Sequence, residues 1–117
     1  MVQEDLKKIV VKGRVWLDIG EKPFLGQGKI ELIEKIKELG SLRKAAMSMK
    51  MSYQQAWFCI NEMNKSAGKP LVILKRGGKD GGIALVTETG EKAIQMFIEL
   101  QEDFKKFVLE RSKSIEL

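Results

Sequence analysis

Apolar residues recur at intervals of three and four positions over several segments of the chain, which is the spacing of one face of an α-helix. The first segment runs from Lys29 to Leu39, and Gly40 directly after it is a typical helix terminator. A third runs from Ser52 to about Ala67 and is followed by Gly68. Between them, a short second segment has its apolar positions at Leu42, Ala45, Ala46 and Met49. The pattern therefore predicts three helices in close succession.

Two serines mark the starts of the second and third helices. Ser41 and Ser52 each precede a helical segment, and serine is among the best residues for accepting a hydrogen bond from the free amides of a first helical turn. Only a short connection separates the two helices. Two helices joined this tightly are typical of a helix-turn-helix, whose second helix can enter the major groove of DNA.

The segment after the third helix predicts a β-hairpin. Leu71–Lys75 and Ile83–Thr87 are short apolar strands, and the loop Arg76–Gly82 between them contains four glycines. A hairpin directly after a recognition helix is the wing of a winged helix. The loop is not a nucleotide-binding P-loop, because Asp80 follows Lys79 where such a loop needs Ser or Thr, and because it joins two strands.

The two ends of the chain add a strand and a long helix. Arg14–Ile19 has the β-branched and aromatic content of a strand, and Glu21–Gly28 is a loop rich in helix and strand breakers. Thr87 caps the C-terminal helix. Along that helix, four large apolar residues recur at alternating intervals of three and four, and we call them the aromatic seam: Phe97, Leu100, Phe104 and Phe107. We expect the seam to pack on the same helix of a second subunit, with an intramolecular core as the alternative.

The third helix divides into a predicted core face and a predicted exposed face. The core face is expected to hold Tyr53, Ala56, Trp57, Ile60, Met63 and Ala67, with Trp57 as its anchor. The exposed face is expected to hold Gln54, Gln55, Phe58, Asn61, Glu62 and Lys65. The amides on this face are the side chains best suited to read a base.

Positive charge is concentrated in the segment that carries these motifs. The whole chain has 21 Lys and Arg against 16 Asp and Glu, a net charge of +5. Between Ser41 and Gly82 there are eight basic and two acidic residues, so this third of the chain carries +6 and the remainder −1. A basic surface that coincides with a helix-turn-helix and a wing is typical of a protein that faces phosphates.

The composition also argues against several other classes of protein. The chain has no histidine and a single cysteine, Cys59, which excludes the usual zinc sites, histidine-based catalysis and an internal disulfide. We therefore predict a protein that is not an enzyme and has no cofactor or metal, and whose natural setting is the reducing cytoplasm. No run approaches the roughly 20 apolar residues of a membrane span, and the N-terminus lacks the apolar core of a signal peptide.

Several short phrases together resemble the N-terminal DNA-binding domain of the ModE-type, molybdate-responsive regulators. They are Gly40-Ser-Leu-Arg-Lys-Ala-Ala, Met51-Ser-Tyr-Gln-Gln-Ala-Trp, Asn61-Glu-Met-Asn, Pro70-Leu-Val, Gly77-Gly-Lys-Asp-Gly-Gly and Leu85-Val-Thr-Glu-Thr-Gly. LysR-type regulators look similar in fold, but the double-glycine wing favours the ModE-like group. The resemblance implies a homodimer in which the first and last helices form the subunit contact and each recognition helix reads one half-site. Full-length members add C-terminal oxyanion-binding domains, so a chain that ends at Leu117 is expected to be a stand-alone form without them, and its small-molecule effector is not assigned.

Most of the predicted DNA-binding residues are expected to contact either base edges or phosphates. The alternative for each of these residues is a solvated surface position. Gln54, Gln55 and Asn61 have the amides that bind adenine N6 and N7, although Ser52 and Gln55 also have the spacing of a capping box. Phe58 is left open between a thymine methyl and a protein surface, either the wing or a partner subunit. The group expected to meet phosphate comprises Arg43, Lys44, Lys75, Arg76 and Lys79, and backbone amides beside Ser41 and Ser52. Tyr53 and Lys65, on the recognition helix, complete the set.

These observations predict an α+β, mainly α fold, a winged helix-turn-helix with a long C-terminal dimerisation helix. We expect one domain over residues 1–117, with a winged-helix core at 13–87 and the dimerisation helix at 88–117. The predicted function is a homodimeric, sequence-specific transcription regulator that binds double-stranded DNA. The alternative is a winged-helix module that binds another protein and no DNA.

Overall fold

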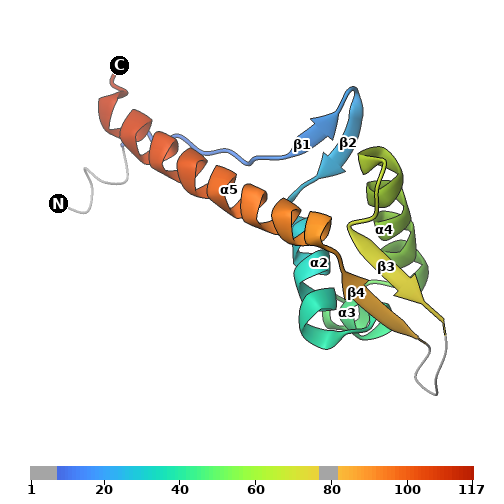
Figure 1. Ribbon diagram of the computed structural model, residues 1–117. Helices are drawn as coiled ribbons and strands as arrows, with labels where there is room; N and C mark the ends of the chain where they lie inside the picture. The colour runs from blue at the N-terminus through green and yellow to red at the C-terminus, as the bar shows by residue number, and fades with distance from the viewer. Residues whose placement is uncertain (1–7, 77–81) are drawn as a thin grey trace.

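Figure 1 shows the computed structural model of the protein, which describes residues 8–76 and 82–117. A small hairpin precedes three helices, and a second hairpin and a long helix follow them. In chain order the elements are β1 (Leu17–Ile19), β2 (Lys22–Leu25), α2 (Gln27–Leu39), α3 (Leu42–Ser48), α4 (Tyr53–Ala67), β3 (Val72–Lys75), β4 (Ile83–Val86) and α5 (Glu88–Ser114). Each hairpin is a two-stranded antiparallel sheet. The predicted winged helix-turn-helix, with its long last helix, is therefore confirmed.

The capping residues explain where the helices of the helix-turn-helix begin and end. The Ser41 hydroxyl accepts a hydrogen bond from the Lys44 amide at 3.2 Å. Ser52 accepts from the Gln55 amide at 3.1 Å, and the Gln55 side chain accepts in return from the Ser52 amide at 3.2 Å. This reciprocal pair is a complete capping box. Gly40 ends α2 with a φ of 69°, a left-handed conformation that glycine adopts without steric cost.

One hydrophobic core joins the three central helices, the wing and the start of α5. From α3 it includes Leu42, Ala45 and Ala46, and small side chains there let a neighbouring helix approach closely. The remaining buried apolar residues are Leu25, Ile30, Leu32, Ile33, Ile36, Ala56, Ile60, Met63, Leu71, Val72, Ala84, Ala93, Ile94 and Phe97. Their shared burial fixes the recognition helix, α4, against both its scaffold and the wing.

The N-terminal region differs from its prediction. The strand expected over Arg14–Ile19 covers only Leu17–Ile19, and residues 22–25 of the expected loop form a second strand, β2. Pro23 misled the prediction because proline cannot donate a strand hydrogen bond, but proline is tolerated in an edge strand. The first of the three helices also begins earlier, at Gln27 instead of Lys29.

Helix α5 is partly core and partly an extension beyond it. Its first turns bury Gly90, Ala93, Ile94 and Phe97, while the rest runs away from the other helices, beside the N-terminal segment (Figure 1). The Val11 amide donates to the Ser112 hydroxyl at 2.8 Å, which ties the segment to the last turns of the helix. Gly13 lies against the ring of Phe104, because a Cβ there would come within 2.9 Å of it.

The aromatic seam is therefore split between two environments. Phe97 is fully buried in the core of its own chain, so its predicted place in a subunit contact is wrong. Leu100 and Phe104 are half-buried, and Phe107 is 57% exposed. Only the distal part of the seam is available to a partner.

Within residues 8–76 and 82–117, no helix is both long enough and apolar enough to cross a bilayer. The same part of the chain contains no group of three or more Cys, Asp or Glu residues arranged to hold a metal ion.

Candidate nucleic-acid interface

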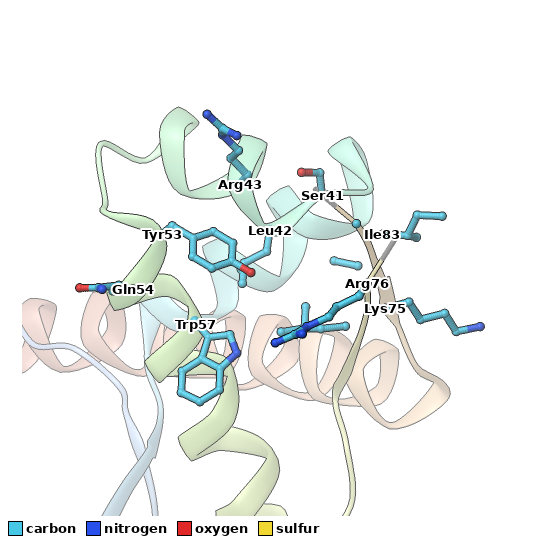
Figure 2. Close-up of a pocket in the computed structure, with 12 residues that line it drawn as sticks. Ser41, Leu42, Arg43, Tyr53, Gln54, Trp57, Lys75, Arg76 and Ile83 are labelled. Carbon is cyan, nitrogen blue, oxygen red and sulfur yellow. The ribbon is translucent and has the colours of Figure 1, made fainter. Parts of the chain in front are cut away.

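An open groove of about 600 Å³ lies between α4 and the wing, and the first residues of α3 close one end of it (Figure 2). Tyr53 and Trp57 line it from α4, and Leu74, Ala84 and Ile83 line it from the wing. Three cationic side chains also line it: Arg43, Lys75 and Arg76. Among residues 8–76 and 82–117, no carboxylate lines the groove. The groove therefore combines apolar walls with positive charge, a combination that suits an anionic ligand with apolar surface.

Trp57 faces this groove instead of the core. Its side chain is 45% exposed, and that of Tyr53 is 49% exposed, so the prediction that both lie on the core face of α4 is wrong. The buried stripe of the helix is Ala56, Ile60 and Met63. Trp57 follows Ala56 directly, and one residue along a helix turns the side chain by about 100°, which directs the indole toward the wing.

The outer face of α4 is largely as predicted. Gln54, Asn61 and Lys65 are exposed, and Gln54 lines the edge of the groove with its side-chain amide directed away from the wing in Figure 2. Phe58 is 59% exposed and does not line the groove facing the wing. Its open alternatives, a thymine methyl, the wing and a partner subunit, therefore stay predictions.

Gln55 has a structural role of its own. Its side-chain oxygen accepts a hydrogen bond from the Ser52 amide, so the predicted capping box between Ser52 and Gln55 is confirmed. Ser41 and Ser52 likewise act as helix caps. Whether any of the three also meets DNA stays a prediction.

The basic side chains of this surface are exposed and unpaired within the described residues. Arg43, Lys44, Lys65, Lys75 and Arg76 form no ion pair with an acidic residue that the structure describes. No acidic side chain within residues 8–76 and 82–117 therefore neutralises these charges. Lys79 and the rest of the predicted wing loop, residues 77–81, lie outside the described residues.

The Asn64 side chain ties α4 to the first residues of the wing by hydrogen bonds. The Asn64 side-chain oxygen accepts from the amides of Leu71 (2.8 Å) and Val72 (3.4 Å), and its nitrogen donates to the Val72 carbonyl at 2.9 Å. The Asn64 side chain thus makes hydrogen bonds to the backbone at the start of β3 that a neighbouring strand would otherwise make. A second tie runs from the Ala84 amide of β4 to the Gly40 carbonyl, at 3.1 Å. Together these bonds hold the wing against the helix-turn-helix from two sides.

The start of α5 is bonded to the residues directly before β3. The Thr87 hydroxyl donates to the Pro70 carbonyl at 2.7 Å and accepts from the Gly90 amide at 3.0 Å. Gly90 is packed so closely that a Cβ would collide with the Leu71 carbonyl oxygen and with Val86. The structural roles of Asn64 and Gly90 were not predicted from the sequence. Both nevertheless lie in phrases that carried the family resemblance, and the structure gives those phrases a physical role.

The geometry defines the class of protein: a winged helix-turn-helix with a basic surface on its recognition helix and wing. No protein-family model matches the chain. Among solved structures, the BenM DBD/benA site 1 DNA complex has a similar fold, with a TM-score of 0.54 and 19% identity over 78% of this chain and 100% of that one. A LysR family transcriptional regulator, VV2_1132, gives a TM-score of 0.52 at 22% identity over 69% of this chain and 26% of that one.

In sequence, the chain is a relative of the ModE-type regulators over the matched segment, and the resemblance seen in its motifs is confirmed. It is 34% identical to the molybdenum transport protein ModE of Azotobacter vinelandii over 92 residues, which are 79% of this chain and 34% of that protein. It is 37% identical to the DNA-binding transcriptional dual regulator ModE of Escherichia coli K12, over 69% of this chain and 31% of that protein. A third relative is the molybdenum-pterin-binding protein MopB of Rhodobacter capsulatus, at 32% identity over 80% of this chain and 34% of that protein. The chain spans about a third of the length of these relatives.

Proposed function

We propose that the protein is a transcription regulator that binds double-stranded DNA in a sequence-specific manner, as a homodimer. The observation that carries the proposal is the alignment of three features on one surface: the exposed face of α4, the groove beside the wing, and basic side chains that pair with no described acid. The kinship with the ModE regulators and the fold shared with the BenM DNA-binding domain support it.

In this proposal the two kinds of side chain have separate tasks. The outer face of α4 enters the major groove, where the amides of Gln54 and Asn61 read base edges and Phe58 meets a thymine methyl. The basic residues bind phosphates and set affinity and its dependence on salt, as do the charges predicted on the wing loop, including Lys79. The protein performs no catalysis in this role and needs no cofactor.

The distal part of α5 is the proposed contact between subunits. Met96, Leu100 and Phe107 lie four and seven residues apart and share a stripe of the helix, and Met96 and Phe107 are 45% and 57% exposed. An isolated helix of about 12–15 residues is marginal in water, so the part of α5 beyond the core gains stability from a partner helix. A second copy would also supply a second recognition helix for the other half-site.

We further propose that residues 1–117 act as one domain, with the winged-helix core at 13–87 and the rest of α5 as its dimerisation helix. The reducing cytoplasm is the proposed setting, supported by the single, half-buried Cys59.

Selection from a pool of random double-stranded DNA, with the bound fraction sequenced at two salt concentrations, tests the function. An enriched palindrome would support a dimeric regulator and would give the half-site spacing. Binding without enrichment would contradict sequence specificity. No binding even at low salt would overturn the proposal and favour a protein-interaction module, for which the exposed Trp16 (67%) and Phe107 (57%) would be the contact residues.

A further inference from the structure

The groove between α4 and the wing adjoins the face of α4 that is proposed to read bases, and Gln54 lies at the border between the two. Figure 2 shows the Trp57 ring and the Arg76 guanidinium turned toward each other across it, while Arg43 and Lys75 point outward from its rims. Nearly half of the Trp57 side chain is exposed there. A large indole held open to solvent between cations is an unusual use of tryptophan in a small domain, where tryptophan is mostly buried.

The position of Trp57 on the helix indicates what the groove receives. Gln54 and Trp57 are three residues apart and therefore neighbours along α4. If Gln54 lies at the base edges, the indole one turn further along is placed at the wall of the major groove, where the DNA backbone runs. The backbone alternates apolar deoxyribose with anionic phosphate. The described part of the groove pairs apolar walls with the cations Arg43, Lys75 and Arg76 and has no carboxylate in its lining.

We propose that this groove seats the sugar–phosphate backbone of one strand of double-stranded DNA, with the Trp57 indole against deoxyribose and Arg76 on the adjacent phosphate. This inference rests on the proposed function and adds an apolar contact residue that binds DNA without reading sequence. An apolar contact and a charged contact differ in one measurable respect. Only the charged one releases counterions, so only Arg76 contributes to the salt dependence of binding.

The fluorescence of Trp57 itself provides the first test. The chain has two tryptophans, and Trp16 lies beside α5, away from this groove. In a Trp16→Phe protein, all tryptophan emission therefore comes from Trp57. We expect a random-sequence duplex at low salt to shield this emission from acrylamide quenching. A Trp16→Phe protein that binds the duplex, as measured by anisotropy of labelled DNA, with unchanged quenching would overturn the groove proposal and leave the proposed function standing.

Two further variants in the same background separate the apolar contact from the charged one. Trp57→Leu should weaken binding by about tenfold, which corresponds to about 1.4 kcal/mol, and leave the slope of log affinity against log salt unchanged. Arg76→Ala should lower that slope by about one. Circular dichroism verifies that each variant is folded, which the exposure of both side chains favours. Full affinity in Trp57→Leu, or a changed slope in it, would contradict the assignment. Failure of the unsubstituted protein to bind any duplex would overturn the proposed function itself.

Discussion

Replacing Asn64 with alanine should loosen the joint between the recognition helix and the wing. The Leu71/Thr87 pair is joined by a bond from the Thr87 amide to the Leu71 carbonyl, and hydrogen-bonded pairs alternate along an antiparallel ladder. The backbone groups of Val72 therefore face away from β4, toward Asn64. Because Leu71 and Val72 are each only 1% exposed, water reaches these groups poorly once the amide side chain is gone.

The size of the effect follows from the groups left without a partner. A buried polar group that loses its hydrogen bond costs about 1–3 kcal/mol, so two such groups should lower the free energy of unfolding by about 2–6 kcal/mol. For a domain of this size the melting temperature should fall by on the order of 10 °C. Thermal unfolding followed by circular dichroism measures this directly.

Asn61 provides the matched control, because it lies one turn earlier on α4 and is exposed. Asn61→Ala should change stability by no more than about 0.5 kcal/mol, as expected for a surface site. If Asn64→Ala melts at the same temperature as Asn61→Ala, the side-chain bonds of Asn64 do not hold the wing, and the reasoning above is refuted.

Three further substitutions test other parts of the structure. Gln54→Ala should bind random duplexes normally and lose discrimination of about 1–3 kcal/mol at one base pair of a selected site; equal losses on selected and random duplexes would contradict a reading role. Gly90→Ala should destabilise the fold by about 1–3 kcal/mol through its collision with the Leu71 carbonyl oxygen and Val86. Gly28→Ala, with nothing within 4 Å, should not, and equal melting temperatures would argue against the close packing. Phe107→Glu should give monomers in sedimentation at unchanged fold, while Leu109→Glu, nearly opposite on α5, should leave dimers, and the reverse result would place the subunit contact elsewhere.

The helix-turn-helix was predictable because its signals are local. Ser41, Ser52 and Gly40 act through hydrogen bonds and backbone angles within a few residues, and the structure uses them as the sequence indicates. The direction in which the Trp57 side chain points was not predictable from such local signals. A helical pattern identifies a buried stripe, but residues at its edge are buried or exposed according to what packs beside them, and here the neighbour is the wing.

The misassignment of Phe97 has a similar cause. Residues at intervals of three and four share a face of α5, but the sequence does not state where along the helix that face leaves the core. In the structure this happens after Phe97, since Leu100 and Phe104 are only half-buried. The role of Asn64 was not predictable because the sequence does not distinguish a helical asparagine that contacts water from one that bonds to the edge of a strand.

The continuity of α5 ties together two regions that are far apart. At about 1.5 Å per residue, its 27 residues span about 40 Å. Its first turn is bonded to the start of the wing through Thr87 and packed on it through Gly90. An uninterrupted helix anchored in this way transmits a change of tilt, so in the proposed dimer on DNA a force that reorients its far end would also shift the wing. The spacing and orientation of two wings would then respond to whatever sets the angle between two such helices.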